Sequence, residues 1–200
     1  DPTNGVFSWI PSRLQAPSTN LITVTVTDNG SPAMSDSKSF WAYVNHYLEV
    51  TVSSTYVKAG QTGSVARTLF SSAPLTNLSL WLGYNEQQLQ DWALAPGPGG
   101  IADGWISSTN NLQLAMNFAP APGLTLQGTQ ELAQLQFVGF TNVPLAFLPL
   151  KIVAAVGRRP DGTRMEKSLL NDGTVIVYDY RGVLQASLSP EQDHALVLYG

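Results

Sequence analysis

The residues that could perform acid–base or metal chemistry are few and scattered along the chain. Its two histidines, His46 and His194, do not fall in a spacing that would bring a second metal ligand close. Acidic pairs such as Glu86 with Asp91 or Asp172 with Asp179 have the residue types that glycosidases use, but fourteen acids in 200 residues produce such pairs by chance. The sequence contains no GxSxG, no HExxH and no glycine-rich phosphate loop. We therefore expect a protein that is not an enzyme.

Composition narrows the classes of partner. The chain has no cysteine, which excludes disulfides, thiolate zinc sites and a cysteine nucleophile. A net charge of −4 leaves no basic stripe for phosphates, so we expect neither nucleic-acid binding nor docking to an anionic membrane. No apolar run is long enough for membrane insertion. The expected partner is another protein or a neutral polymer, and the first residues, DPTNG, indicate a segment of a longer protein.

One tryptophan stands where a polar residue is expected. In the stretch NLSLWLGY, Leu78, Leu80 and Leu82 share one face of a strand, so Trp81 lies on the other face beside Ser79. The same alternation in NLQLAMNF and ELAQLQFVGF places amides on the side opposite the large apolar residues. If these strands share a sheet, its outer face carries a nearly uncharged set of candidate binding residues: Ser79, Trp81, Gln113, Asn117, Gln134 and Gln136.

The elements that position these residues are strands. Only 12% of residues are charged, while Gly, Pro and small polar residues are abundant, as is typical of turn-rich all-β proteins. Three strands are expected near the N-terminus, over residues 5–10, 21–28 and 35–45. Eight more are expected over residues 48–54, 64–71, 75–84, 105–108, 111–118, 131–140, 145–157 and 173–179, which indicates a sandwich or jelly roll. Residues 85–94 are expected to form a crossing connection, or a helical turn because Leu89, Trp92 and Ala93 have helical spacing.

The N-terminal residues resemble a known repeat. DPTNGVFSW and TVTVTDNGSPAMSDSKSFWAYVN are similar to the second half of the cadherin-like or Ig-like repeats of bacterial surface proteins. The resemblance implies a calcium site at Asp1, Asp28 and Asp36, the only cofactor it suggests. The alternative is that these aspartates stabilise turns, as Asp-Asn-Gly sequences do.

Residues 48–180 resemble a second family. YVKAGQTGSV, LSLWLGYNEQQLQ, NLQLAMNFAP, ELAQLQFVGF and SLLNDGTVIVYD follow the order and spacing of a cohesin-like module. The resemblance implies a jelly-roll sandwich of the Ig-like class whose outer sheet face receives a dockerin, a small helical protein module. Asn85 departs from the family, which has an aspartate after the tyrosine.

The sequence leaves three hypotheses open for the face that carries Trp81. It binds a protein module such as a dockerin; it stacks on a polysaccharide; or the chain itself covers it and the protein is a calcium-stiffened spacer. The first reading makes the protein a recognition, adhesion or scaffold module of a secreted or cell-surface multimodular protein. The expected domains are a partial cadherin-like repeat over 1–46, a cohesin-like sandwich over 47–180, and a linker with the first strand of a following module or a sandwich edge over 181–200.

The partial repeat raises a packing problem. Two or three strands expose an apolar face and unpaired edges. We expect this surface to be covered by the cohesin-like module or by another copy of the chain through self-association of the N-terminal strands. Trp9 and Trp41 are expected to fill the core of this part, and Trp92 and Trp105 to anchor the loop over residues 95–100.

Overall fold

A computed structural model describes residues 5–84, 88–110, 113–141, 145–165 and 168–179, and most of these lie in strands. The all-β fold class is confirmed. Two strands form a separate N-terminal hairpin, β1 (Ser18–Thr27) and β2 (Ser35–Val44). The other strands are β3 (Leu48–Val52), β4 (Thr55–Lys58), β5 (Thr62–Leu75), β6 (Asn77–Gly83), β7 (Leu89–Pro96), β8 (Ala102–Asn110), β9 (Gln113–Pro120), β10 (Leu126–Gly139), β11 (Leu145–Arg158), β12 (Ser168–Asn171) and β13 (Gly173–Tyr178). Short 3-10 turns occur at η1 (Arg13–Gln15) and η2 (Pro98–Gly100).

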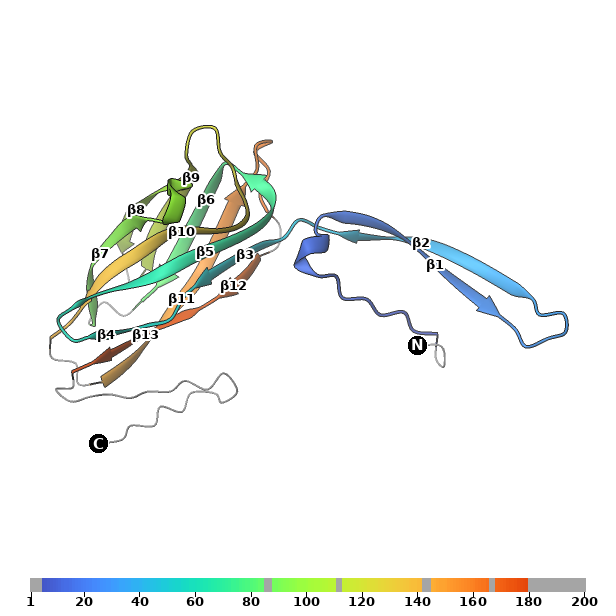
Figure 1. Cartoon of the computed structure of the whole chain (residues 1–200), viewed down its shortest axis with the longest axis horizontal. Coiled ribbons are helices and arrows are strands. Elements are labelled where there is room, and N and C mark those ends of the chain that lie inside the picture. Colours follow the sequence, from blue (N-terminus) through green and yellow to red (C-terminus); the bar gives the residue numbers. More distant parts are fainter. Residues whose placement is uncertain (1–4, 85–87, 111–112, 142–144, 166–167, 180–200) are drawn as a thin grey trace.

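Strands β3 to β13 form two sheets packed face to face (Figure 1). One has five strands in the order β12-β3-β5-β10-β7, and the other has six in the order β4-β13-β11-β6-β9-β8. The pairs β12–β3 and β13–β4 are parallel, and the other paired strands are antiparallel. This is the predicted β-sandwich, and it contains more strands than the sequence patterns indicated.

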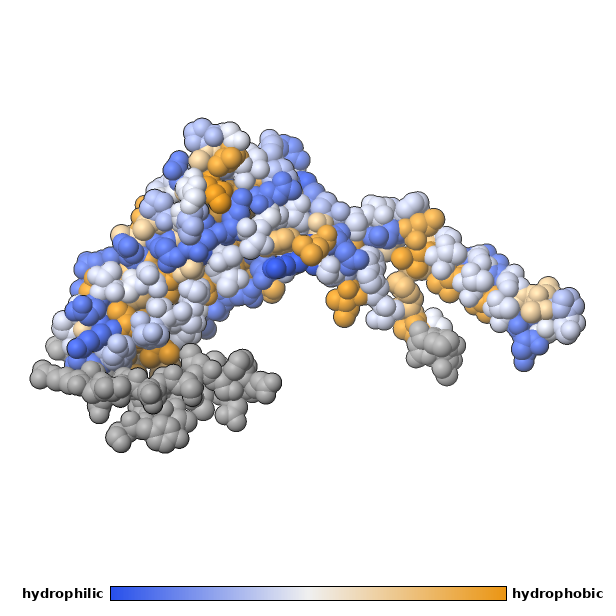
Figure 2. All heavy atoms as spheres, viewed as in Figure 1, coloured by the Kyte–Doolittle hydropathy of each residue, from blue (hydrophilic) through white to orange (hydrophobic). Residues whose placement is uncertain are grey.

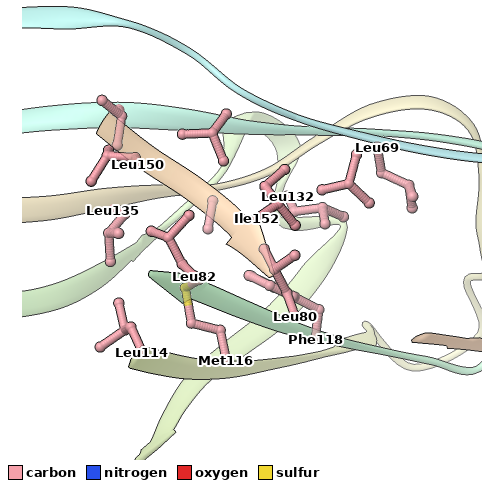
Figure 3. Close-up of a cluster of buried hydrophobic side chains, with 14 of the residues drawn as sticks. Leu69, Leu80, Leu82, Leu114, Met116, Phe118, Leu132, Leu135, Leu150 and Ile152 are labelled. Carbon is pink, nitrogen blue, oxygen red and sulfur yellow. The ribbon is translucent and has the colours of Figure 1, made fainter. Parts of the chain in front are cut away.

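The core of the sandwich follows the period-two alternation of its strands. Leu78, Leu80 and Leu82 of β6 are completely buried, as are Leu114 and Met116 of the neighbouring β9. Figure 3 shows Leu80, Leu82, Leu114 and Met116 meeting side chains of the opposite sheet in the space between the layers: Leu69, Leu132 and Leu135. Alternate residues therefore face the solvent on each sheet, which makes the outer faces available for recognition.

Strand β7 corrects the expectation for residues 85–94. Residues 85–87 lie outside the described residues, but Leu89–Pro96 form a strand that pairs with β10 instead of a helical turn or an irregular connection. Trp92 packs against Tyr84 and Phe137 with ring centroids 4.8 and 5.5 Å apart. The helical spacing of apolar residues there is overridden by pairing with a long central strand.

Strand β11 joins the two parts of the six-stranded sheet. Its first half, from Leu145 to Leu150, pairs with β13, and its second half, from Lys151 to Arg158, pairs with β6. At the change of partner the backbone N–H of Ile152 donates to the Asp172 carboxylate at 2.8 Å. Asp172 thus satisfies a backbone group where the ladder changes strand, which is a structural role.

A buried arginine interrupts the apolar interior. Arg67 of β5 is completely buried, and its Nη1 donates to the Val65 carbonyl at 3.1 Å. Its Nε and Nη2 have no hydrogen-bond partner among the described residues. Because burial disfavours the charged form, the pKa of Arg67 is lowered to about 9.

The N-terminal hairpin belongs to neither sheet of the sandwich and extends away from it (Figure 1). Residues 5–10 are not a strand, contrary to the prediction. Arg13 connects this part to the sandwich, with Nη1 3.1 Å from Glu49 Oε2 and the guanidinium 4.8 Å from the centre of the Phe70 ring. Surface ion pairs of this kind contribute at most about 1 kcal/mol.

The sandwich does not cover the apolar residues of the hairpin. The prediction that the cohesin-like module covers them is therefore wrong. Figure 2 shows orange apolar residues at the surface along the hairpin and the segment before it. Phe7 packs edge-on against Phe40 with centroids 5.9 Å apart, yet Phe40 stays 44% exposed. Trp41 is 56% exposed, so it does not fill a core, and Trp9 is only partly buried.

Candidate partner-binding face

Trp81 lies on the outer face of the six-stranded sheet, as the alternation of its strand predicts. Its direct neighbours across the ladder are Ala154 on β11 and Ala115 on β9. The indole is partly buried and stands between two methyl groups that are too short to cover it. A large flat apolar group with small neighbours is suited to anchor a partner surface.

A polar cluster lies one register step from Trp81. The Ser79 hydroxyl donates to Asn117 Oδ1 at 2.7 Å, and Asn117 Nδ2 donates to Ser107 Oγ at 3.0 Å. The Ser107 hydroxyl in turn donates to the Ala115 carbonyl at 3.2 Å. These bonds link three strands and hold the Asn117 amide in one orientation, so it is ordered before a partner arrives.

Three residues of this face were not identified from the sequence. Trp105 of β8 lies directly across from Asn117 and is 48% exposed, so it does not anchor the neighbouring loop as expected. On β11, Phe147 and Val153 face outward and are each 53% exposed. The register between strands was needed to find them, because both faces of β11 are apolar and its alternation gives no orientation.

The charged residues of β11 and β8 on this face flank the part of it around Trp81. Lys151 pairs with Gly83 at one end, and Arg158 pairs with Asn77 at the other, where Asp103 pairs with Ala119. The described side chains between these rows are uncharged. Removing water from the centre therefore costs little free energy, while the flanking charges remain in solvent. This is the usual division between the core and the rim of a protein interface.

Gln134 and Gln136 do not belong to this face, which corrects the contact set expected from the sequence. Both lie on β10, and β10 is in the five-stranded sheet between β5 and β7. Their side chains point to the outer face of that sheet, on the opposite side of the sandwich from Trp81. Gln134 also donates to Glu131. Of the six predicted residues, Ser79, Trp81, Gln113 and Asn117 share the six-stranded face.

Where they are described, the aspartates considered for calcium accept hydrogen bonds from backbone N–H groups. Asp28 Oδ1 accepts the N–H groups of Gly30 at 3.0 Å and Met34 at 2.8 Å, and these bonds lower the pKa of Asp28. Asp36 Oδ1 accepts the N–H of Ser37 at 2.9 Å. Asp1 lies outside the described residues. Within the described ranges no three histidine, aspartate or glutamate side chains gather as metal ligands would.

The remaining residues that could perform acid–base or metal chemistry do not form a site in the part of the chain that the structure describes. His46 has no cluster of further ligands there. Asp172 and Asp179 flank the two ends of β13 and do not form a carboxylate pair. Glu86, His194 and the whole of residues 181–200 lie outside the described residues. The described helical segments are two short 3-10 turns, and neither could cross a membrane.

Comparison with known proteins identifies the fold of the sandwich. The third cohesin of ScaC from Acetivibrio cellulolyticus, solved in complex with the ScaB dockerin, superposes with a TM-score of 0.57 and 18% identity over 66% of this chain and 99% of that one. A non-cellulosomal cohesin from Archaeoglobus fulgidus gives 0.53 and 16% over 66% and 92%. The cohesin module of a family 33 glycoside hydrolase from Clostridium perfringens gives 0.55 and 11% over 68% and 98%.

The sandwich has the cohesin fold. No family model matches the chain, and no curated protein matches it by sequence. The likeness to cohesins is therefore one of structure at low sequence identity. The similarity of residues 1–46 to half of a cadherin-like repeat stays a prediction.

Proposed function

We propose that the outer face formed by β11, β6, β9 and β8 of the cohesin-like sandwich binds a dockerin module. The observation that carries the proposal is the uncharged face around Trp81, with the hydrogen-bonded cluster of Ser79, Asn117 and Ser107 beside it. A protein partner is supported by the fold, because several cohesins of similar structure were solved in complex with dockerins.

The arrangement suits a helical partner. The face is a sheet surface with two tryptophans, Trp81 and Trp105, on strands that are separated by β9. The Asn117 amide lies across from Trp105, in the register row next to that of Trp81. A helix lying on this face would bury apolar side chains on the indoles and pair a polar group with the amide. Hot spots of protein interfaces combine such aromatic anchors with an ordered polar contact.

The proposal assigns no catalysis to this chain. It makes the chain a recognition or scaffold module, and we place it outside the cell, in a secreted or surface-attached multimodular protein, as the two family resemblances imply.

Isothermal titration calorimetry with a panel of purified dockerin modules tests the proposal. We expect at least one module to bind, and Trp81→Ala to weaken that binding by about 30-fold or more, as for an interface hot spot. Gln136→Ala is the matched control, because it changes a polar residue on the opposite sheet. The proposal is wrong if no dockerin binds, if Trp81→Ala binds as the wild type does, or if Trp81 is required for a polysaccharide instead.

A further inference from the structure

The two faces of the N-terminal hairpin differ in chemistry. One face, named here the hydroxyl–aromatic face, is formed by residues of both strands that pair with each other: Thr19, Leu21, Thr23, Thr25, Thr27, Ser35, Ser37, Ser39, Trp41 and Tyr43. None of these side chains is charged at neutral pH. The charged residues of β2, Asp36 and Lys38, lie on the opposite face with the valines of β1. Figure 2 shows pale polar and orange apolar residues running side by side along the hairpin.

Hydroxyl pairs form a ladder along this face. Thr23 pairs with Ser39 at 2.8 Å, Thr25 with Ser37 at 2.8 Å, and Thr27 with Ser35 at 2.7 Å between the hydroxyl oxygens. Each pair uses one O–H internally, which leaves a second O–H and free lone pairs directed to solvent. Successive pairs are two residues apart, or about 6.8 Å along the strand.

Two exposed aromatic rings continue the same face. Trp41 is 56% exposed and lies across from Leu21, and Tyr43 is 70% exposed and lies across from Thr19. No other described aromatic residue packs on either ring within the ring contacts of the structure. The two rings are adjacent on one face, which also carries the hydroxyl ladder, so together they make a continuous strip along the hairpin.

We propose that the hydroxyl–aromatic face binds an uncharged, extended polysaccharide chain that lies along the strands. The faces of sugar rings carry C–H groups that stack on flat aromatic rings, and their edges carry hydroxyls that match a row of hydroxyl donors and acceptors. The absence of cations from the face disfavours nucleic acids and acidic polysaccharides. A continuous strip on strands of ten residues, about 31 Å long, is suited to a polymer.

This site is independent of the dockerin face. It lies on the hairpin, in a sheet of its own, whereas Trp81 lies on the six-stranded sheet of the sandwich. It also differs from the polysaccharide reading of Trp81, since it involves other residues. One chain would then hold a protein through its sandwich and a polymer through its hairpin.

Affinity electrophoresis of the whole 200-residue chain in gels containing mixed-linkage β-glucan, xyloglucan or galactomannan tests the proposal, with a pull-down on microcrystalline cellulose. We expect at least one neutral polymer to bind the wild type, and polygalacturonate to leave its migration unchanged. Trp41→Ala and Tyr43→Ala should each weaken binding about fivefold to tenfold, because each removes one stacking platform. A Thr23→Val/Thr25→Val variant, which keeps the shape and removes two hydroxyls, should also bind less.

Tyr56→Ala is the matched control, because Tyr56 is an aromatic residue of the sandwich that is 74% exposed. It should bind the polymer as the wild type does, and circular dichroism should show the same strand content in all variants. The proposal is overturned if none of the neutral polymers binds, if Trp41→Ala and Tyr43→Ala bind unchanged, or if binding is lost in Trp81→Ala instead.

Discussion

Strands β6 and β1 have the same alternating pattern and opposite burial. In β6, Leu78, Leu80 and Leu82 are all 0% exposed, whereas in β1 Val24 and Val26 remain 41% and 68% exposed. The difference arises because β6 lies in a sheet that packs on a second sheet, while β1 has only β2 beside it. Alternation therefore indicates which residues share a face of a strand. Whether that face is buried depends on whether a second sheet packs against it.

The two regions also present their aromatic residues to partners in different ways. The sandwich buries its apolar face and presents Trp81 and Trp105 on an ordered outer surface. The hairpin leaves most of both faces exposed to solvent. Burial therefore does not indicate which of its faces binds a partner, and only the chemistry of the exposed residues does. We therefore expect substitutions in the two regions to affect different properties.

Stability should depend strongly on the sandwich core. Phe118→Ala removes a ring that is 0% exposed, and we expect it to lower the free energy of unfolding by about 3–5 kcal/mol. Phe40→Ala, the same change at a residue 44% exposed in the hairpin, should change the free energy of unfolding of the sandwich by less than about 0.5 kcal/mol. Urea denaturation followed by Trp fluorescence measures both. Equal losses from the two variants would remove the distinction between the regions.

Arg67 is the exception within the buried core and gives the next largest effect. The Nε and Nη2 of this buried cation have no hydrogen-bond partner among the described residues. Replacing it by an apolar residue of similar length, Arg67→Met, should therefore raise the free energy of unfolding by about 2–4 kcal/mol at pH 7. The pKa of about 9 in the folded protein lies well below the usual range of an arginine side chain. Above pH 9 the unfolded chain therefore binds more protons, and the stability of the wild type rises with pH relative to that of the variant.

Denaturation of both proteins between pH 7 and 10.5 tests this effect. The advantage of Arg67→Met should shrink as the pH rises above 9. A wild type that is more stable than Arg67→Met at pH 7 would contradict the account and would indicate that the guanidinium has stabilising partners.

Self-association through the N-terminal strands, the second cover expected for the hairpin, stays a prediction. A second copy on the face with Val24 and Val26 would bury each valine for about 1.5 kcal/mol of association free energy. Sedimentation velocity should then show a sedimentation coefficient that increases with concentration, and Val26→Asp should abolish the increase. A monomer at all concentrations, with residues 1–46 rapidly digested by protease, would contradict it.

The smallest expected effect is local to the hairpin turn. Asp28→Ala should speed hydrogen exchange at the amides of Gly30 and Met34, because both donate to its carboxylate. These bonds lower the pKa of Asp28, so the stabilisation is present at neutral pH and is lost as the pH falls through the lowered value. Protection factors from exchange followed by NMR, measured as the pH is lowered from 6, test it. Unchanged exchange in Asp28→Ala would show that the turn does not depend on the aspartate.

Much of the fold could be predicted because strands of this protein alternate cleanly. The faces of β6 and β9 were correct for Ser79, Trp81, Gln113 and Asn117. Gln134 and Gln136 were assigned to the wrong surface because alternation gives the face of a strand but not the sheet to which the strand belongs. Sheet membership depends on pairings between strands distant in sequence, such as β10 with β5 and β7.

The buried arginine was present in the pattern but was not recognised. In SVARTLF, Val65, Arg67 and Leu69 have the same parity, so the alternation already placed Arg67 with the core residues. Its complete burial follows from its place on β5, a central strand of the five-stranded sheet. Strand β7 was missed for a related reason, since its pairing with β10 outweighs the helical spacing of its apolar residues.

Hydroxyl-radical footprinting of the tryptophans, read by mass spectrometry with and without a bound dockerin, tests the central claim most directly. If the outer face of the six-stranded sheet is the partner surface, oxidation of Trp81 and Trp105 falls on binding, while Trp41 on the hairpin is oxidised as before. Binding that leaves Trp81 and Trp105 unprotected, or that protects Trp41 instead, would contradict the account.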